Sequence, residues 1–363
     1  MNKIHGGNIY EIAGELGQNP GKIIDFSASI NPLGKSRRAE RKLRESFGAI
    51  LHYPDSRCEA LRETLARFHG LEKSQVFPGA GSTEFIYAIP RVLKITRALI
   101  VRPAFSEYEN ALENYPGGED CTIHYFETHE EDGFEINIGS LLFALTQGYN
   151  ALYLSNPGNP TGILADRDGL MKVLAQTEKE KTWFILDEAF IDFREEDSLK
   201  GEAGRSSRLI ILRSLTKFFA LPGLRAGYLV ANPEVIQEFS KHQDPWAVNV
   251  LAQIAGVESL KDRGYIARTQ KAIAEERRYL TRELQSLPGL IPYPSQANYL
   301  FVQIHPSQDL TAAELREKLI PQGILIRDCN SFPPVGPYFF RIAVRSRKEN
   351  NMLLKALHQV VVP

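Results

Sequence analysis

Short apolar runs alternate with longer amphipathic stretches along most of the chain. The runs, each followed by glycine, proline or a polar residue, are ALIVRPAF, NALYLSNPGNPTG, TWFILDEAF, RLIILRSLTK and AGYLVANP. Strands of this kind separated by helical patterns predict a parallel sheet covered by helices. Because ligands bind beyond the carboxyl ends of such strands, the residues after each run are the first candidates for a site.

The pattern changes near residue 250. A long charged helical stretch, ARTQKAIAEERRYLTRELQSL, leads into GLIPYPSQANYLFVQI, a helix near TAAELREKLI, and the segments GILIRDC and YFFRIAVRS. Two or three strands with helices on one face predict a smaller α+β domain. We therefore expect an N-terminal arm with part of the small domain over residues 1–45, a large α/β domain over 46–250, and the small domain over 251–363.

Composition and charge narrow the class of protein. With 363 residues, 43% of them hydrophobic, the chain can bury a sizeable core or two unequal ones. Its 43 basic and 44 acidic side chains nearly cancel and form no basic block, which favours neither a nucleic-acid nor a membrane partner. The start has no signal-peptide pattern, and no run of about 18 apolar residues could span a bilayer. We expect small-molecule partners.

The cysteines and histidines have no spacing typical of a metal site. Cys58, Cys121 and Cys329 are odd in number and widely scattered, which fits neither a disulfide framework nor a zinc ribbon. The eight histidines show no HExxH or other compact ligand spacing. We therefore predict a reducing, cytoplasmic setting and no metal site.

Lys217 and Asp187 are the candidate catalytic residues. Lys217 lies just past one apolar run with only Arg225 as a like charge nearby, so its pKa is expected to be lowered and its amine to form an imine with an aldehyde. Asp187 ends another run, where a buried carboxylate needs a cationic partner such as a protonated pyridine nitrogen. A single lysine after a strand is usually solvated, but the two residues together are the minimal set for pyridoxal 5'-phosphate.

The segment PGAGSTE predicts an anion site at the start of a helix. Its backbone amides and hydroxyl groups could bind the cofactor phosphate, and two hydroxyl residues beside Lys217, together with Arg225, would close around the same group. Asn156 could donate to the ring hydroxyl oxygen, and Phe105 could stack on the ring. The expected cofactor-binding residues are Ala80, Gly81, Ser82, Thr83, Phe105, Asn156, Asp187, Ser214, Thr216, Lys217 and Arg225.

Several of these motifs together resemble the fold-type I aminotransferase family. SNPGNPTG, LDEAFIDF, RSLTKFFALPGLRAGY and YFFRIAVRS follow the order and spacing of its histidinol-phosphate aminotransferase branch over nearly the whole chain. The opening HGGNIYEIAGELG with IIDFSASINPLG resembles the L-threonine-O-3-phosphate decarboxylases of cobalamin biosynthesis. The resemblance implies a large domain with a mostly parallel seven-stranded sheet, a smaller α+β domain, and pyridoxal 5'-phosphate. It also implies decarboxylation of L-threonine O-3-phosphate to (R)-1-amino-2-propanol O-2-phosphate and carbon dioxide.

The resemblance further implies substrate contacts and a partner subunit. Arg341 would bind the substrate carboxylate with Asn156 beside it, while Arg327 and the turn at His5 and Gly6 would bind the substrate phosphate. Tyr53 in HYPD would reach the cofactor phosphate of a partner subunit, which makes the active unit a homodimer. The full set of expected substrate-binding residues is His5, Gly6, Ser29, Asn156, Arg327 and Arg341.

Two positions depart from the patterns of these families. Ser29 lies where the decarboxylases usually have asparagine near the substrate. Phe190 lies where many aminotransferases have a tyrosine hydroxyl on the ring oxygen, a change that is usual among the decarboxylases. Arg345 lies four residues after Arg341 on the same expected strand, and it could be a structural salt-bridge partner rather than a substrate contact.

Two other functions stay open at this point. An aminotransferase acting on histidinol phosphate would keep the fold, Lys217 and Asp187, but would require a 2-oxo acid acceptor. A catalytically idle binding protein is the other alternative, against which the presence of Lys217 argues.

Overall fold

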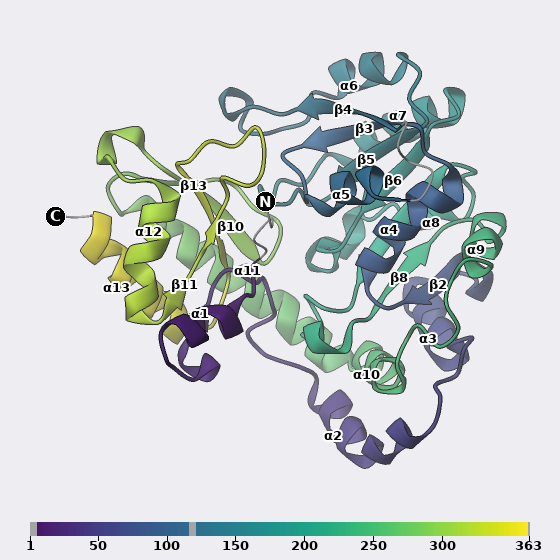
Figure 1. Cartoon of the computed structure of the whole chain (residues 1–363), viewed down its shortest axis with the longest axis horizontal. Helices are drawn as coiled ribbons and strands as arrows, with labels where there is room; N and C mark the ends of the chain where they lie inside the picture. The colour runs from purple at the N-terminus through teal and green to yellow at the C-terminus, as the bar shows by residue number, and fades with distance from the viewer. Residues whose placement is uncertain (1–5, 116–120, 362–363) are drawn as a thin grey trace.

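Figure 1 shows a larger and a smaller body in the computed structural model, which describes residues 6–115 and 121–361. A seven-stranded sheet lies at the centre of the larger body, in the order β2 (Val76–Gly79), β8 (Gly227–Val230), β7 (Leu209–Ser214), β6 (Trp183–Asp187), β5 (Ala151–Ser155), β3 (Arg97–Arg102) and β4 (Thr122–Glu127). Only β8 runs against its neighbours in this sheet. The predicted mostly parallel seven-stranded sheet is confirmed.

Helices cover both faces of this sheet, which explains why its central strands are apolar throughout. On β6, Phe184 and Leu186 pack into one core and Ile185 into the other. The first core also contains residues of α3 (Glu59–His69), α6 (Ile138–Leu145), α7 (Arg167–Lys179), α8 (Lys200–Ala203) and α10 (Val250–Lys261). The second core contains residues of α4 (Ser82–Leu93), α5 (Glu107–Glu113) and α9 (Pro233–Ser240).

Side-chain caps fix where several of these helices begin. The side chains of Asp166, Asn232 and Asn249 accept backbone N–H groups from the first turns of α7, α9 and α10. Such a cap satisfies amides that the helix itself leaves without an acceptor. The strand-to-helix connections are therefore fixed locally, and they set the positions of the strand ends.

The smaller body is built on an antiparallel sheet. Its strands are, in order, β12 (Arg327–Asp328), β13 (Phe339–Ala343), β10 (Tyr299–Ile304) and β9 (Leu290–Pro292). Leucines of α11 (Arg263–Gln285), α12 (Ala312–Leu319) and α13 (Arg347–Val361) pack on one face of it. The expected smaller α+β unit is therefore present.

The segment before residue 46 contacts both bodies. Near the smaller body, α1 (Ile9–Glu15) packs beside β1 (Ile24–Asp25), which pairs in parallel with β11 (Ile324–Leu325). Farther along, α2 (Arg37–Glu45) packs against α10 of the larger body. α11 also joins the two bodies, because Tyr265 lies in the larger core and Leu280 in the smaller one. The exact domain boundaries stay a prediction.

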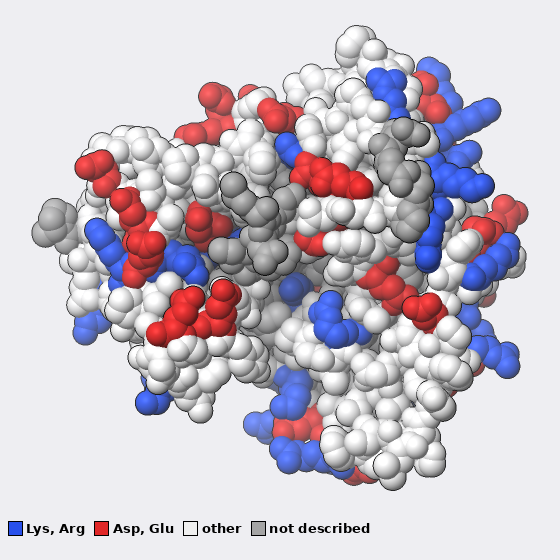
Figure 2. All heavy atoms as spheres, in the orientation of Figure 1, with Lys and Arg blue, Asp and Glu red and all other residues white. Residues whose placement is uncertain are grey.

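The surface carries both signs of charge. Figure 2 shows acidic and basic side chains interspersed over the visible face. In the described part of the chain, no helix combines the length and apolar character needed to cross a membrane.

Candidate active site

A cavity of about 200 Å³ lies at the carboxyl end of the large sheet, facing the smaller body. It is lined by residues from both bodies and from the N-terminal segment, among them Gly6, Ser29, Ser82, Thr83, Phe105, Asn159, Asp187, Phe190, Ser214, Thr216, Lys217, Arg225, Arg327 and Arg341. A second cavity of about 640 Å³ adjoins it and extends toward α12. The ends of β6 and β7 thus bring the predicted lysine and aspartate into one site.

Lys217 lies three residues past the end of β7 and lines the cavity. Burial lowers the pKa of its ammonium group to about 8, and the positive charges of Arg341 and Arg225 add to this effect. The sequence suggested Arg225 as the nearby like charge, whereas Arg341 has the larger influence. A lysine with a lowered pKa is available as a nucleophilic amine near neutral pH.

Asp187 is the last residue of β6, and its carboxylate is buried. Tyr108 donates its hydroxyl to Oδ2 at 2.6 Å, and the backbone N–H of Ala189 donates to Oδ1 at 2.9 Å. Burial raises the pKa of Asp187, against the opposing effect of these hydrogen bonds. A buried carboxylate held at this point would be stabilised by a cationic ring nitrogen.

The turn between β2 and α4 lies against Arg225. Gly81 has φ +92°, and a side chain at this position would meet Nη2 of Arg225 at 3.0 Å. A side chain at Gly227 on β8 would lie 2.4 Å from the backbone nitrogen of Ser82. Glycine at both positions therefore lets the helix start, the strand and the guanidinium approach one another closely.

The turn before α4 uses some of its own backbone amides. The backbone N–H of Ala80 donates to the carboxylate of Glu84, and that of Gly81 donates to the carbonyl oxygen of Gly79 at 2.8 Å. The tight turn thus gives these two amides internal acceptors, and their contact with a cofactor phosphate stays a prediction. Ser82 and Thr83 do line the cavity, so a contact from the first turn of α4 stays a prediction.

Two hydroxyl groups and a guanidinium complete the expected phosphate site. Ser214 Oγ and Thr216 Oγ1 are 2.8 Å apart, and both residues are buried at the cavity. Arg225 follows the 3-10 helix η6 (Pro222–Leu224) with φ +55° and donates to the carbonyl oxygen of Pro222 at 3.2 Å. That bend aims its guanidinium at the Gly81 turn rather than along the chain.

Asn156 and Phe105 both follow strands of the large sheet, but only Phe105 is among the residues that line the cavity. Asn156 follows β5, and its Oδ1 accepts the backbone N–H of Ala165 at 2.8 Å. Its Nδ2 is buried and has no hydrogen-bond partner within the described residues. Phe105 lines the cavity and contacts Tyr108 edge to face. A buried amide donor without an acceptor and a ring face are the groups that an aromatic cofactor with a ring oxygen would use.

Arg341 and Arg327 form the side of the cavity that belongs to the smaller body. They are cross-strand neighbours in the β12–β13 pair, and both are buried. Arg341 donates to the side-chain oxygen of Asn159 and to the carbonyl oxygen of Ser27 at 3.0 Å, while Arg327 donates to Ser331 at 2.8 Å. Burial and the charge of Arg341 lower the pKa of Arg327 to about 10.

The remaining substrate-side predictions differ in outcome. Ser29 and Gly6 line the cavity, and the hydroxyl of Ser29 has no partner among the described residues. His5 lies outside the described residues. Arg345 forms an ion pair with Glu349 at 2.7 Å, so its expected structural role is confirmed.

Tyr53 and Phe190 occupy distinctive positions. Tyr53 is 79% exposed and stacks on Trp246 at 4.5 Å, on the surface rather than at the cavity of its own chain. Phe190 lines the cavity, packs edge to face on Tyr299, and has its ring 6.0 Å from the Lys217 amine. It offers no hydroxyl where a tyrosine would.

Sequence reasoning missed two residues of the site. Tyr108 was not singled out, although its place three residues after Phe105 at the start of a helix could have indicated it. Asn159, the second asparagine of NPGNPTG, contacts Arg341, whereas the motif was interpreted through Asn156 alone.

These observations together fit pyridoxal 5'-phosphate. The lysine offers an amine, Asp187 a buried carboxylate, Asn156 an unsatisfied donor, and Ser214 with Thr216 a pair of hydroxyls beside Arg225. In the described part of the chain, no group of three or more histidine, cysteine or acidic residues gathers in a way that could hold a metal ion.

The fold and this site define the class of protein: an α/β enzyme of fold type I with a lysine and an aspartate at adjacent strand ends. Residues 21–357 match the family described as aminotransferase class I and II, and the chain belongs to this family. It is 38% identical to the threonine-phosphate decarboxylase of Salmonella typhimurium strain LT2 over 99% of this chain and 97% of that protein.

Solved structures agree with this assignment. The L-threonine-O-3-phosphate decarboxylase of Porphyromonas gingivalis superimposes with a TM-score of 0.80 at 26% identity, covering 92% of this chain and 98% of that one. The histidinol-phosphate aminotransferase of Clostridium acetobutylicum gives a TM-score of 0.84 at 28% identity, with the same coverage. Structural likeness alone therefore does not separate the two activities. They have to be distinguished from the residues of the site.

Proposed function

We propose that the protein is a pyridoxal-phosphate-dependent decarboxylase that converts L-threonine O-3-phosphate into (R)-1-amino-2-propanol O-2-phosphate and carbon dioxide. The observation that carries this proposal is the pair of buried arginines, Arg327 and Arg341, facing Lys217 across one cavity. A substrate with an amine, a carboxylate and a phosphate would provide a partner for each of these three groups. The 38% identity to a threonine-phosphate decarboxylase over nearly the full length supports the same choice.

The cofactor would be held at the strand ends. Lys217 would carry it covalently, Asp187 would lie at its ring nitrogen, and Asn156 would donate to its ring oxygen. The cofactor phosphate would lie among Ser82, Thr83, Ser214, Thr216 and Arg225. When bound, pyridoxal 5'-phosphate accepts the electron pair that is released at the α-carbon of the substrate.

The residues of this chain would then decide which bond breaks. Arg341, fixed by Asn159, would hold the substrate carboxylate, and Arg327 would hold the substrate phosphate. Anchoring at two points sets the rotation about the α-carbon, so that the bond to the carboxylate is the one aligned for cleavage. Carbon dioxide leaves without the bonding pair, and a proton takes its place on the α-carbon. Lys217 is the group positioned to deliver that proton.

Phe190 supports decarboxylation over transamination. Its ring packs on Tyr299 and presents only carbon atoms toward the Lys217 amine. No hydroxyl from this position reaches the ring oxygen of the cofactor, so Asn156 would be the donor there.

Product analysis tests the proposed function. The pyridoxal-phosphate-loaded protein is mixed with O-phospho-L-threonine and carbon dioxide is followed over many turnovers, while histidinol phosphate with 2-oxoglutarate is assayed in parallel for glutamate. We expect carbon dioxide and no glutamate. L-threonine is the matched control, and its lack of a phosphate should reduce kcat/KM by about 100-fold. Glutamate without carbon dioxide would instead identify an aminotransferase.

We further propose that the active unit is a homodimer. Leu51 and Tyr53 are 82% and 79% exposed, and Phe47 and Ile50 of the same segment are exposed as well. Trp246, which stacks on Tyr53, is a further exposed apolar side chain. Exposed apolar surface of this kind favours association, and Tyr53 would then reach the partner's cofactor phosphate. The cytoplasmic location of the protein, expected from the scattered cysteines, stays a prediction.

A mixing experiment tests the shared site. Lys217→Ala and Tyr53→Ala subunits are each expected to have little activity, but a mixed dimer would contain one site with both native residues. Equal mixing should therefore restore up to about a quarter of wild-type activity, since half the dimers are mixed and each has one intact site. No recovery after subunit exchange would contradict a site shared between subunits.

A further inference from the structure

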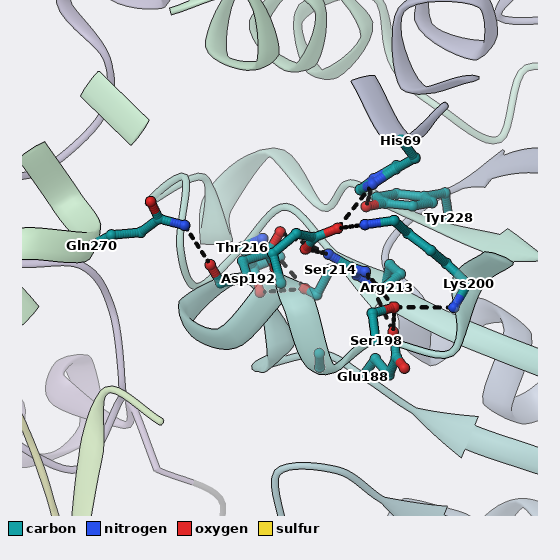
Figure 3. Close-up of polar contacts among 12 residues, drawn as sticks. His69, Glu188, Asp192, Ser198, Lys200, Arg213, Ser214, Thr216, Tyr228 and Gln270 are labelled. Atoms are coloured by element: carbon teal, nitrogen blue, oxygen red, sulfur yellow. Dashed lines mark hydrogen bonds and ion pairs between the residues drawn. The ribbon is translucent and has the colours of Figure 1, made fainter. Parts of the chain in front are cut away.

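A buried charge cluster lies at the ends of β6 and β7 (Figure 3). At its centre is Arg213, the residue before Ser214 on β7, which is 1% exposed. Its guanidinium lies 3.3 Å from a carboxylate oxygen of Glu188, 3.0 Å from Asp192 and 2.5 Å from Glu195. None of these residues lines the candidate active site.

The cluster residues alternate along the chain with residues of the site. Glu188 directly follows Asp187, and Arg213 directly precedes Ser214. Because successive side chains at a strand end point to opposite faces, the ion pair lies beneath the two strand ends whose other faces form the site. Asp192 follows Phe190 by two residues, in the 3-10 helix η5 (Ile191–Asp197) rather than in a strand.

We propose that Arg213 is a positioning residue for the reaction: by binding Glu188 and Asp192 from below, it fixes the spacing of Asp187, Phe190 and Lys217 around the cofactor. This inference rests on the proposed function, since it assumes pyridoxal phosphate between Asp187 and Lys217. The ends of β6 and β7 are otherwise joined through backbone bonds such as Glu188 N–H to the carbonyl oxygen of Leu212 at 2.9 Å. The guanidinium adds side-chain bonds where the regular ladder ends.

Further hydrogen bonds hold the carboxylates in place. Glu188 accepts from the hydroxyl of Ser198 at 2.5 Å and from the backbone N–H of Leu199 at 2.9 Å. These two bonds connect the short link between η5 and α8 to the end of β6. Gln270 of α11 donates to the backbone oxygen of Asp192 at 3.4 Å, so a contact also reaches the helix that joins the two bodies.

A second branch of the cluster reaches the phosphate side of the site. His69, at the end of α3, lies 3.1 Å from Glu195 and 2.7 Å from the hydroxyl of Tyr228. Tyr228 is the cross-strand partner of Arg213, and the preceding Gly227 lies against the turn before α4. Burial lowers the pKa of His69 to about 4, so it bridges the two as a neutral hydrogen-bonding group.

The chemistry of the cluster favours positioning over simple stabilisation. Buried ion pairs contribute little stability compared with apolar packing of the same volume, but they define geometry. A guanidinium presents donors in a planar fork and can bind several carboxylates at fixed angles, whereas an ammonium group is a point charge. Replacing Arg213 by lysine would therefore keep the charge and lose the geometry.

Cofactor binding to the apo-protein tests this role. We compare wild type, Arg213→Lys and the control Arg67→Lys, which changes an exposed arginine paired with Glu63 at 2.6 Å on α3. Two quantities are measured: the Kd for pyridoxal phosphate, and the pH midpoint of the visible absorbance of the loaded protein. We expect Arg213→Lys to weaken binding by about tenfold and to move the midpoint by about half a unit or more. Arg67→Lys should match wild type in both.

A purely structural role predicts a different result. In that case Arg213→Lys would lower the thermal stability of the apo-protein while its Kd and pH midpoint stayed with those of wild type, and the proposal would be overturned. Glu188→Gln is the second variant, because it keeps the size of the side chain and leaves Arg213 with Asp192 and Glu195. It should weaken cofactor binding by about threefold even if Arg213→Lys does not fold. Failure of wild type itself to bind the cofactor would refute the proposed function and this inference with it.

Discussion

Arg213 lies next to the site residue Ser214 and Arg341 lines the site; both arginines are buried, and they differ in the charge of their partners. Arg213 contacts three carboxylates from its own chain. Arg341 donates to the amide oxygen of Asn159 and to a backbone oxygen, which are both neutral. The Nε of each arginine has no partner among the described residues. A buried cation is stable only when an anion is near it. Arg213 has its anions in the fold, whereas Arg341 is suited to receive one from the substrate.

The neighbour of Arg341 strengthens this comparison. Arg327 is its cross-strand partner, and like charges opposite each other destabilise a sheet. The lowered pKa of Arg327, to about 10, reflects burial and the charge of Arg341. Binding a carboxylate and a phosphate would relieve this repulsion, so part of the substrate affinity would come from the free protein's unfavourable charge arrangement.

The largest effect is expected from a substitution at Lys217. Lys217→Ala removes the amine that would hold the cofactor and deliver the proton, so we expect carbon dioxide release to fall by about 10⁴-fold or more. The visible absorbance of the cofactor-bound protein should disappear as well. Far-ultraviolet circular dichroism of the variant is the control for folding. Retained turnover with phosphothreonine would show that another group performs this step.

Arg213→Met should lower the stability of the fold, because the charge of Arg213 is compensated by carboxylates of the chain itself. It leaves Glu188 and Asp192 without their cation, whereas Glu195 keeps its ion pair with Lys200, and we expect the free energy of unfolding to fall by about 3–5 kcal/mol. Urea titration of the apo-protein measures this loss. If stability hardly changes, the carboxylates are accommodated in some other way and the cluster does not depend on Arg213.

Arg341→Met should affect catalysis more than folding. Loss of the charged contact to the substrate carboxylate is expected to reduce kcat/KM by about 100-fold, with most of the change in KM if the contact is as strong before the transition state as in it. Steady-state kinetics with O-phospho-L-threonine measure both constants. A variant whose KM and kcat both equal those of wild type would remove Arg341 from the substrate site.

Tyr108→Phe should have a smaller effect on the cofactor side. The change removes the 2.6 Å hydrogen bond to Asp187 and leaves the carboxylate with the backbone N–H of Ala189. We expect the Kd for pyridoxal phosphate to rise by about fivefold. Tyr153→Phe is a matched control in the same core, because the hydroxyl of Tyr153 has no partner among the described residues. Equal affinities for the two variants would contradict a role for Tyr108 at Asp187.

The smallest effect concerns how the free energy of unfolding of the apo-protein changes with pH. The folded pKa of Lys217, about 8, lies below its ordinary value of 10.5. Between these two values the unfolded chain binds the proton and the folded chain does not, so stability rises with pH across this window and is lower below pH 8. We expect a rise of about 1 kcal/mol between pH 8 and pH 9 that Lys217→Met lacks. Parallel curves for both proteins would mean that the pKa is not lowered.

The sequence predicted best what depends on strand ends. Each apolar run forms a strand, and chemistry-bearing residues lie at the strand's last position or directly after it, as Asp187, Ser214 and Asn156 do. Periodicity and glycine punctuation were sufficient because a parallel sheet aligns these ends without further information. The predicted seven-stranded sheet and the family are both confirmed.

The parts that were missed depend on tertiary contacts between distant segments. Arg341 lies 124 positions after Lys217 in the numbering, yet it is the leading charge on that lysine. The cluster around Arg213 was also not visible, because Glu188, Asp192 and His69 have no common spacing along the chain. At the Gly81 turn the sequence indicated free amides, whereas the fold uses those of Ala80 and Gly81 internally.

The most direct test of the central claim compares two apo-proteins under the same conditions. The free energies of unfolding of Arg213→Met and Arg341→Met are measured in urea without cofactor or substrate. We predict a loss of about 3–5 kcal/mol for Arg213→Met and a change within about 1 kcal/mol for Arg341→Met, because only the first breaks a compensated charge. Equal losses would contradict the claim that the charge of Arg213 is compensated within the fold and that of Arg341 is left for a substrate anion.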